Sequence, residues 1–287
     1  MKKYSILTYI FNNDEFIREV PKEDNIEYVC VTDNPNSKSD TWKIIVDEDL
    51  KGLDPLYASF YVRHHPWKYC SGDVCIRIDG SIRINKSLLP IFEEFDNSSY
   101  DVCVMVNSRA KSINEELFHW LNIMYKDVKS KQLELYKSLG INTEDYGVIQ
   151  SPITITRNTD ICNKCDALCW DIIDRLSTDK QTMRPSQVAL TVALQLTEGL
   201  NIMFVDETLI QSDVMQWCNH NSDIIRKSLY VVKHSSFFGK PIKIHNFNGV
   251  HCNNDIVWRE AAERKSLYDI FNSIKQHAPK QDLCGNT

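Results

Sequence analysis

Hydrophobic residues along this chain gather into short runs, and the runs alternate with longer stretches of helical pattern. The runs are rich in β-branched and aromatic residues and end at turn residues, which is typical of β-strands. We predict strands at 4–11, 26–32, 42–46, 74–78, 101–106, 151–156 and 201–205. We predict helices at 55–65, within 86–95, and at 114–139, 160–176 and 185–196. Because strands and helices alternate through residue 110, we expect an α/β fold with a mainly parallel sheet flanked by helices.

No stretch of the chain reads as a linker, an internal repeat or a low-complexity segment. A length of 287 residues allows one large domain or two small ones, and α/β folds of this length are often single. After residue 212 the chain becomes more polar, and it closes with an amphipathic segment at 256–277. We therefore predict one domain at 1–211 and a C-terminal helical extension at 212–287 that packs on the same domain.

The composition is that of an ordinary globular protein, with 43% hydrophobic and 25% charged residues. A net charge of −6 argues against a nucleic-acid polymer as partner, because such a partner requires a basic surface. It does not exclude a small anionic ligand held by a few local Lys and Arg side chains. No apolar run approaches the roughly 20 residues of a transmembrane segment. The apolar run at 4–10 is too short and too polar for a signal peptide, so we expect a cytoplasmic protein.

Ten cysteines are many for the cytoplasm. Cys162, Cys165 and Cys169 form a C-x2-C-x3-C pattern, which allows a zinc or iron–sulfur site with a distant fourth ligand. The same spacing puts the three side chains on one face of a helix. The pattern favours a buried helix face, and a metal site is the alternative.

The most informative stretch is the apolar run at 74–78, which is followed by Asp79-Gly80-Ser81. An acid at the end of a buried strand lies at the carboxyl edge of the sheet, where open α/β sheets bind ligands. The alternative is an ordinary Asp-Gly turn. The chain has no G-x-G-x-x-G after its first strand and no Walker A sequence, so the usual nucleotide fingerprints are absent.

Four pieces of the chain then line up in order. They are YVCVTDNP at 28–35, Arg63 with Lys68, IDGSI at 78–82, and Arg-Pro-Ser-Gln at 184–187. These pieces resemble a glycosyltransferase-like family that includes plant mucilage-related proteins and many bacterial polysaccharide-locus proteins. The resemblance covers roughly residues 4–210. The resemblance implies a GT-A fold, in which a Rossmann-like domain at 1–211 binds a nucleotide-sugar donor.

The resemblance also implies a divalent cation, Mn²⁺ or Mg²⁺, held at the donor diphosphate by a D-x-D motif. Asp79 fits the first acid of that motif, but Ser81 replaces the second, and Ser is a poor metal ligand. Either Asp79 holds the metal with another group, or Arg63 and Lys68 take its place at the phosphates. Residues at the ends of the first two strands are expected to contact the base and ribose. These are Thr8, Tyr9, Thr32 and Asp33.

Two later segments resemble donor-binding segments of glycosyltransferases. The segment that ends in Ser186-Gln187 resembles the Arg-Asp-Gln helix start of the family, with Ser186 in place of the acid. Gln187 is therefore expected to position the donor sugar. His234 and Lys240 resemble, with altered spacing, a His-x-x-Gly-x-x-Lys-Pro segment of family-eight glycosyltransferases, in which the His binds metal and the Lys binds phosphate. The pair at 206–207 offers further carboxylates for a base or acceptor role, with a turn as the alternative. No residue is identified as the catalytic base.

From these observations we expect a glycosyltransferase that moves a sugar from a nucleoside-diphosphate donor, by resemblance a UDP-sugar, to a glycan or lipid-linked acceptor in surface polysaccharide assembly. Asp79 and Gln187 are its expected catalytic residues. Such a role would place the protein in the cytoplasm or at the inner face of the membrane. The alternative is a non-catalytic nucleotide-sugar or glycan-binding protein of the same fold, since two of the expected acids are missing.

Overall fold

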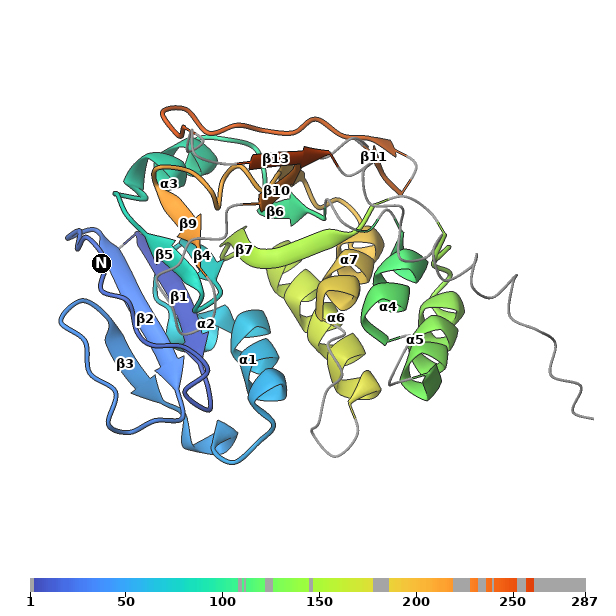
Figure 1. Ribbon diagram of the computed structural model, residues 1–287, viewed down its shortest axis with the longest axis horizontal. Coiled ribbons are helices and arrows are strands. Elements are labelled where there is room, and N and C mark those ends of the chain that lie inside the picture. Colours follow the sequence, from blue (N-terminus) through green and yellow to red (C-terminus); the bar gives the residue numbers. More distant parts are fainter. Residues whose placement is uncertain are drawn as a thin grey trace, which may run out of the picture.

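The computed structural model describes residues 3–107, 110, 112–121, 126–144, 147–177, 186–218, 228–231, 236–238, 240–251 and 257–260. A seven-stranded sheet runs through the molecule in the order β3-β2-β1-β4-β7-β6-β8 (Figure 1). Its strands are β1 (Tyr4–Ile10), β2 (Ile26–Thr32), β3 (Lys43–Val46), β4 (Val74–Ile78), β6 (Val102–Val106), β7 (Ile149–Arg157) and β8 (Ile202–Val205). Only β7 is antiparallel to its neighbours in this sheet. The predicted α/β fold with a mainly parallel sheet is confirmed.

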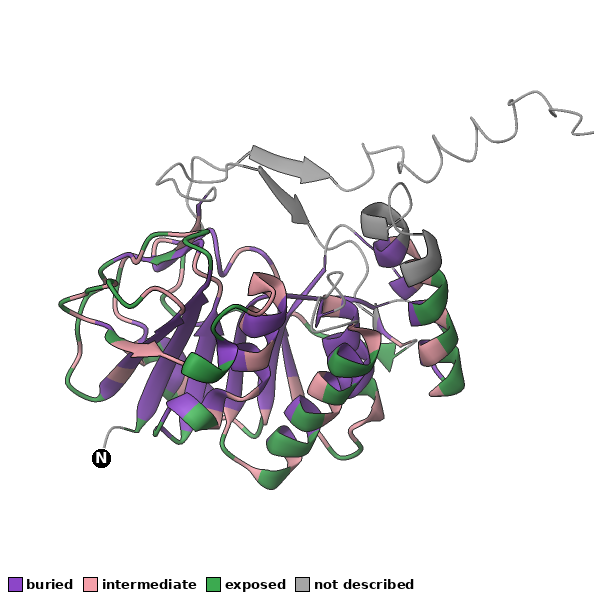
Figure 2. Ribbon diagram, turned by 90° about the horizontal axis from the view of Figure 1, so that it is seen from below, coloured by how far each residue is buried: buried purple, intermediate pink, exposed green. Residues whose placement is uncertain are grey.

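Helices cover both faces of the sheet. They are α1 (Pro55–His64), α2 (Pro66–Tyr69), α3 (Leu89–Asp96), α4 (Ile113–Leu121), α5 (Lys126–Ser138), α6 (Asp160–Leu176) and α7 (Ser186–Leu196), with a 3-10 turn at Glu48–Leu50. Residues of β1, β4 and β6 are buried without exception, which is why these strands read as continuous apolar runs rather than as alternating ones. Figure 2 shows the buried residues concentrated in the sheet and on the helix surfaces that meet it.

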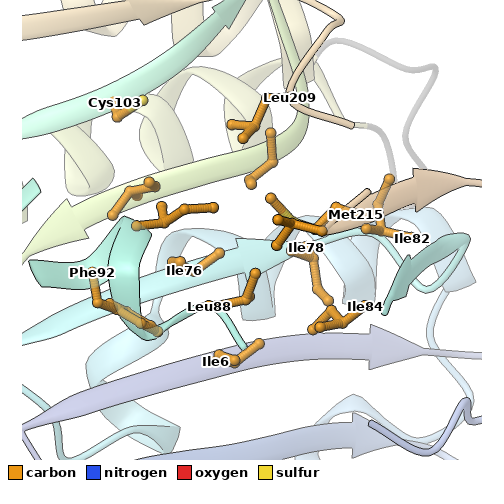
Figure 3. Packing of buried hydrophobic residues seen from close by; sticks show 14 of the residues in the cluster. Ile6, Ile76, Ile78, Ile82, Ile84, Leu88, Phe92, Cys103, Leu209 and Met215 are labelled. Carbon is orange, nitrogen blue, oxygen red and sulfur yellow. The ribbon is translucent and has the colours of Figure 1, made fainter. Parts of the chain in front are cut away.

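The core on the α3 face joins helix and sheet through large side chains. Ile6 and Ile76 of the sheet pack with Leu88 and Phe92 from the α3 segment (Figure 3). Phe92 also stacks on the ring of Tyr4, with 4.6 Å between the ring centroids. On the opposite face, Ala58 and Val62 of α1 pack on Leu7 and Val29.

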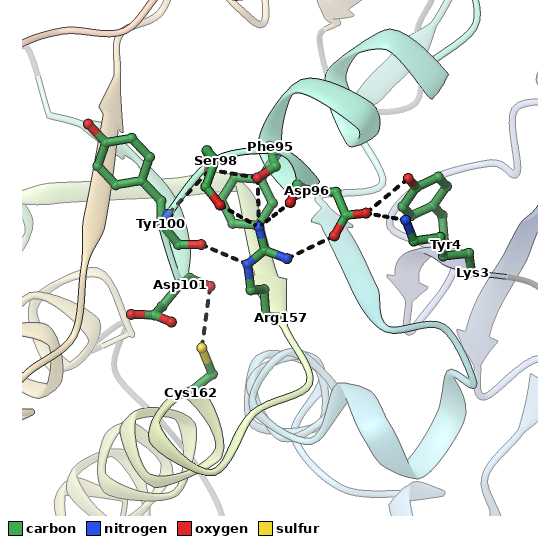
Figure 4. A network of polar contacts seen from close by, with 9 residues as sticks. All are labelled: Lys3, Tyr4, Phe95, Asp96, Ser98, Tyr100, Asp101, Arg157 and Cys162. Atoms are coloured by element: carbon green, nitrogen blue, oxygen red, sulfur yellow. Dashed lines mark hydrogen bonds and ion pairs between the residues drawn. The ribbon is translucent and has the colours of Figure 1, made fainter.

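Arg157 at the end of β7 ties the C-terminal end of α3 to the sheet (Figure 4). Its guanidinium donates to the carbonyl oxygens of Phe95 (2.8 Å) and Ser98 (3.1 Å) and pairs with the carboxylate of Asp96 (2.8 Å). It also donates to the carbonyl of Tyr100 at 2.8 Å. The last carbonyls of a helix have no partner within the helix, and Arg157 supplies one to the carbonyl of Asp96 at 2.9 Å.

The predicted single helix at 114–139 is wrong, because the structure has two helices there, α4 and α5, which pack against each other. Ile113 and Tyr136 belong to one buried cluster. A continuous helix would separate these two residues by roughly 35 Å, at 1.5 Å per residue. The need to bury both ends in one core therefore outweighs the continuous helical pattern.

Three short strand pairs complete the described part of the chain. They are β5 (Ile82–Ile84) with β9 (Met215–Trp217), β10 (Ser228–Val231) with β13 (Val257–Glu260), and β11 (Ser236–Phe237) with β12 (Lys240–Pro241). Val257–Glu260 is a strand, which corrects the expected helical extension for these residues, and 261–287 lie outside the described residues. Within the described residues, no helix combines the length and the apolar character that a membrane span requires.

Candidate functional site

A cavity of about 280 Å³ lies at the carboxyl ends of β1 and β4. β1 is the point at which the order of the sheet reverses, with β2 on one side and β4 on the other. Ligands of open α/β sheets bind in the crevice at such a switch point. The cavity walls come from the end of β1 and the loop after it, α1, the turn at 79–81, Glu116 of α4, Ser151 of β7 and the start of α7.

Arg63 of α1 organises the base of this cavity. Its Nε donates to the Tyr9 hydroxyl, its Nη1 donates to the Ser151 hydroxyl at 2.6 Å, and its Nη2 pairs with Oδ1 of Asp79. The Tyr9 hydroxyl donates to the same Asp79 oxygen at 3.0 Å. Burial opposes the charge of Arg63, but Tyr9 and Asp79 outweigh it and raise the pKa of the guanidinium. Burial also raises the pKa of Tyr9, so its hydroxyl stays protonated and can donate.

The turn after β4 brings the backbone close to the loop after β1. A Cβ at Gly80 would come within 3.1 Å of the Ile10 side chain and 3.2 Å of the Glu15 side chain, so this approach favours glycine. Arg18 donates to the carbonyl of Gly80 and pairs with Glu15 at 3.3 Å. The Ser81 hydroxyl accepts from Nε1 of Trp217 at 3.2 Å. Arg18 from the loop after β1 and Trp217 from β9 therefore both fix the turn at 79–81.

Among the described residues that line the cavity, four carry carboxylates and one carries a guanidinium. The carboxylates are Asp14, Glu15, Asp79 and Glu116, and the guanidinium is that of Arg63. Glu116 was not predicted. Its signal was present in the sequence, because it shares the apolar face of α4 with Ile113 and Leu117 at helical spacing, and both of these are buried.

A second buried network lies behind Arg63. Arg77 of β4 donates to Oδ1 of Asp166 at 2.6 Å and to the carbonyl of Arg63 at 2.8 Å. His64 contacts the same carboxylate oxygen through Nδ1 (3.2 Å), and its Nε2 lies 3.4 Å from Sγ of Cys169. Burial by itself raises the pKa of Asp166. The positive charge of Arg77 and the contact with His64 outweigh burial, and the pKa of Asp166 is lowered. Burial lowers the pKa of His64 to about 4, so this imidazole is neutral at neutral pH.

The neutral state of His64 predicts a pH-dependent stability. The pKa of His64 falls from 6.5 to about 4 on folding, so the unfolded chain binds more protons between these values. The free energy of unfolding should therefore decrease as the pH falls through this window, by about 2 kcal/mol from pH 7 to pH 5. Denaturant unfolding at a series of pH values measures this slope. His64→Asn keeps an amide donor near the Nδ1 position for Asp166 and should flatten this slope, and an unchanged slope in that variant would contradict the assignment.

Five of the predicted binding residues, Lys240 among them, are not part of the cavity lining. Lys68 pairs instead with Asp47 at 2.8 Å. Both carboxylate oxygens of Asp33 accept from the backbone N–H of Asn12 (3.1 and 3.0 Å), and Thr32 accepts from the backbone N–H of Asn34. Thr8 is a buried residue of β1. The groups at Thr32 and Asp33 therefore stabilise the turns that follow β1 and β2.

Of the later segments, Ser186 and Gln187 form the first turn of α7 and line the cavity with Asp79. Lys240 is exposed on β12 and is not among the lining residues. His234 lies outside the described residues. Asp206 accepts from the backbone N–H of Thr208 at 3.0 Å, which is a turn contact.

Cys162, Cys165 and Cys169 lie on the buried side of α6, as the helix-face interpretation predicted. Within the part of the chain that the structure describes, no group of three or more His, Cys, Asp or Glu side chains is arranged to hold a metal ion. At the cavity, Oδ1 of Asp79 is already engaged by Arg63 and Tyr9. Asp79 and Ser81 therefore do not form a complete metal site by themselves.

No protein-family model matches this chain, and no curated protein matches its sequence. The structure is similar to the galactosyltransferase LgtC in complex with donor and acceptor sugar analogs, with 12% identity over 71% of this chain and 74% of that one, at a TM-score of 0.39. It is similar to mouse xyloside xylosyltransferase 1 in its apo form (10% identity, 88% and 97% covered, TM-score 0.42). It is also similar to the apo bifunctional glycosyltransferase WbbM (10% identity, 77% and 46% covered, TM-score 0.47). At these identities and TM-scores, similarity to known structures does not indicate an activity for this chain.

Proposed function

We propose that this protein is a glycosyltransferase that binds a nucleoside-diphosphate sugar in the cavity between β1 and β4. The observation that supports this is the Asp79–Arg63–Tyr9 cluster at the switch point of the sheet, where a ligand meets a fixed guanidinium and a fixed carboxylate. The UDP-sugar donor, the glycan or lipid-linked acceptor and the role in surface polysaccharide assembly are carried over from the resemblance in sequence.

Arg63 is proposed to contact the donor diphosphate. A guanidinium has five N–H groups, and Arg63 uses three of them on side chains of the described chain. Within the described residues, two of its N–H groups remain for phosphate oxygens, and arginine is well suited to bind phosphate in a bidentate way. Asp79 would then hold Arg63 in place and face the donor ribose or metal, and Gln187 would face the sugar.

A divalent cation is proposed to arrive with the donor. The lining carries more carboxylates than cationic groups, and this excess opposes an uncompensated diphosphate. Mg²⁺ in nucleotide enzymes is usually bound by one or two carboxylates together with substrate phosphates and water. Asp79 can supply such a carboxylate, and the bound ion would neutralise charge on the leaving diphosphate.

A thermal-shift panel tests this proposal. UDP-, GDP-, CDP- and dTDP-sugars are each measured with and without Mn²⁺. At about 100 times its dissociation constant, a ligand adds about 2.7 kcal/mol to stability. We expect one nucleotide class to stabilise the protein, and to do so more strongly with Mn²⁺ than without it. The absence of any shift across the panel would contradict the proposal.

A non-catalytic binding protein is the second candidate, and one observation favours it. Ser81 and Ser186 stand where the resemblance leads one to expect acids, and the Ser81 hydroxyl is committed to Trp217. Donor stabilisation without release of nucleoside diphosphate, with any acceptor or with water, would support this candidate over the transferase.

A further inference from the structure

Glu116 is a carboxylate enclosed in the protein that nevertheless faces the cavity. The residue is 5% exposed and lies in the first turn of α4. Its Oε2 accepts from Nδ2 of Asn107 at 3.0 Å. Asn107 is itself fixed at the end of β6, because its backbone N–H donates to the Val148 carbonyl at 2.7 Å and its Oδ1 accepts from the backbone N–H of Ala110 at 3.2 Å. The sheet therefore sets the position of the Glu116 carboxylate.

Three other carboxylates line the cavity. Oδ1 of Asp79 accepts from Arg63 and from Tyr9, and Glu15 pairs with Arg18. Asp14 is exposed on the loop after β1. Placing a carboxylate in a buried position costs free energy, so a buried carboxylate that lines a ligand cavity is a candidate for chemistry.

We propose that Glu116 is the general base of the glycosyl transfer, a role that rests on the proposed function. An oxygen of Glu116 takes the proton of the acceptor hydroxyl as the acceptor oxygen forms its bond to the anomeric carbon. The bond between that carbon and the β-phosphate oxygen breaks, and its electron pair leaves with the nucleoside diphosphate. A single displacement of this kind inverts the anomeric configuration.

The test compares Glu116→Gln with Glu115→Gln. Glutamine keeps the shape of Glu116 and an oxygen that accepts from Asn107, but it cannot take a proton at neutral pH. Glu115 is the matched control, because it lies in the same turn, is half-buried and is not among the cavity-lining residues. UDP-, GDP-, CDP- and dTDP-glucose serve as donors and methanol as acceptor, with release of the nucleoside diphosphate as readout.

We expect Glu116→Gln to lower kcat at least about 100-fold, as removal of a general base does, while the dissociation constant of the donor changes less than about threefold. Glu115→Gln should stay within about threefold of the wild type in both. For the α-linked donors, the expected product is methyl β-glucoside, identified by its anomeric proton signal. Added sodium formate should restore activity to Glu116→Ala, which a purely structural role would not allow.

The outcomes separate two failures. If the wild-type protein binds none of the sugars of the thermal-shift panel, the proposed function fails and the role of Glu116 fails with it. If it binds a donor but releases no nucleoside diphosphate with any acceptor or with water, the non-catalytic candidate is supported and the general-base role is overturned. If the wild type is active and Glu116→Gln keeps its kcat, or only raises KM, the general-base role alone is overturned. Methyl α-glucoside as product overturns it as well. If Glu116→Gln does not fold, the role is tested by the kcat of Glu116→Asp and by the formate rescue of Glu116→Ala, and the absence of rescue would overturn it.

Discussion

Replacing Arg77 with methionine is expected to lower the free energy of unfolding by about 3–5 kcal/mol. The side chains of Arg77 and Asp166 are 3% and 7% exposed, and their charged groups lie 2.6 Å apart. Removing one partner of a buried pair leaves the other charge in a poorly solvated position, which costs far more than the pair contributed. Equilibrium unfolding in denaturant measures the loss.

Arg83→Met is the matched control, because Arg83 is exposed on β5 and the chemical change is the same. It should change stability by less than about 0.5 kcal/mol. The double variant Arg77→Met with Asp166→Leu should recover part of the loss, since it removes both charges. Equal effects of Arg77→Met and Arg83→Met would show that the buried pair has no special role.

Replacing Arg63 with methionine is expected to abolish most of the donor-dependent stabilisation. Hydrogen bonds to charged groups contribute about 1.5–3 kcal/mol each, so losing two phosphate contacts should weaken binding at least about 100-fold. At a donor concentration that stabilises the wild type by about 2.7 kcal/mol, the variant should then gain only about 0.4 kcal/mol. The thermal shift with the best donor of the panel measures this difference.

Lys68→Met is the control for this experiment, because Lys68 pairs with Asp47 outside the cavity lining. Its donor-dependent shift should match that of the wild type. Asp79→Asn provides a second variant if the loss of the Arg63 contacts prevents folding. The side chain of Asp79 is 32% exposed and that of Arg63 is 7% exposed, so replacing Asp79 should destabilise the fold less than replacing Arg63. A normal donor shift in Arg63→Met would remove Arg63 from the binding site.

The local sequence predicted the elements whose ends have a local cause. The strand at 26–32 and the strand at 74–78 are each bounded by polar turn residues, and both match the structure to the residue. The helix at 160–176 also matches, because Thr159 accepts from the backbone N–H of Cys162 and thereby begins the helix at Asp160. Alternation of such elements was enough to predict the α/β fold.

The direction of β7 was not predictable in the same way. Its apolar pattern is the same whether the strand runs parallel or antiparallel, since each of its faces is buried. Only pairing with β4 on one side and β6 on the other decided it. The division of 114–139 into α4 and α5 has a similar origin, because both halves bury residues in one core.

The sequence by itself determined the fold class and the position of Asp79 at the end of a central buried strand, because burial and turn formation act between near neighbours in the chain. Tertiary structure alone decided which charged side chains share the cavity. Arg63 lies in the last turn of α1 and pairs with Asp79, whereas Lys68 belongs to the short helix that begins at Pro66 and pairs with Asp47. Glu116 reaches the same cavity from α4 through the packing of a distant helix. Charge and spacing are alike for many side chains, and only long-range packing brings particular ones together.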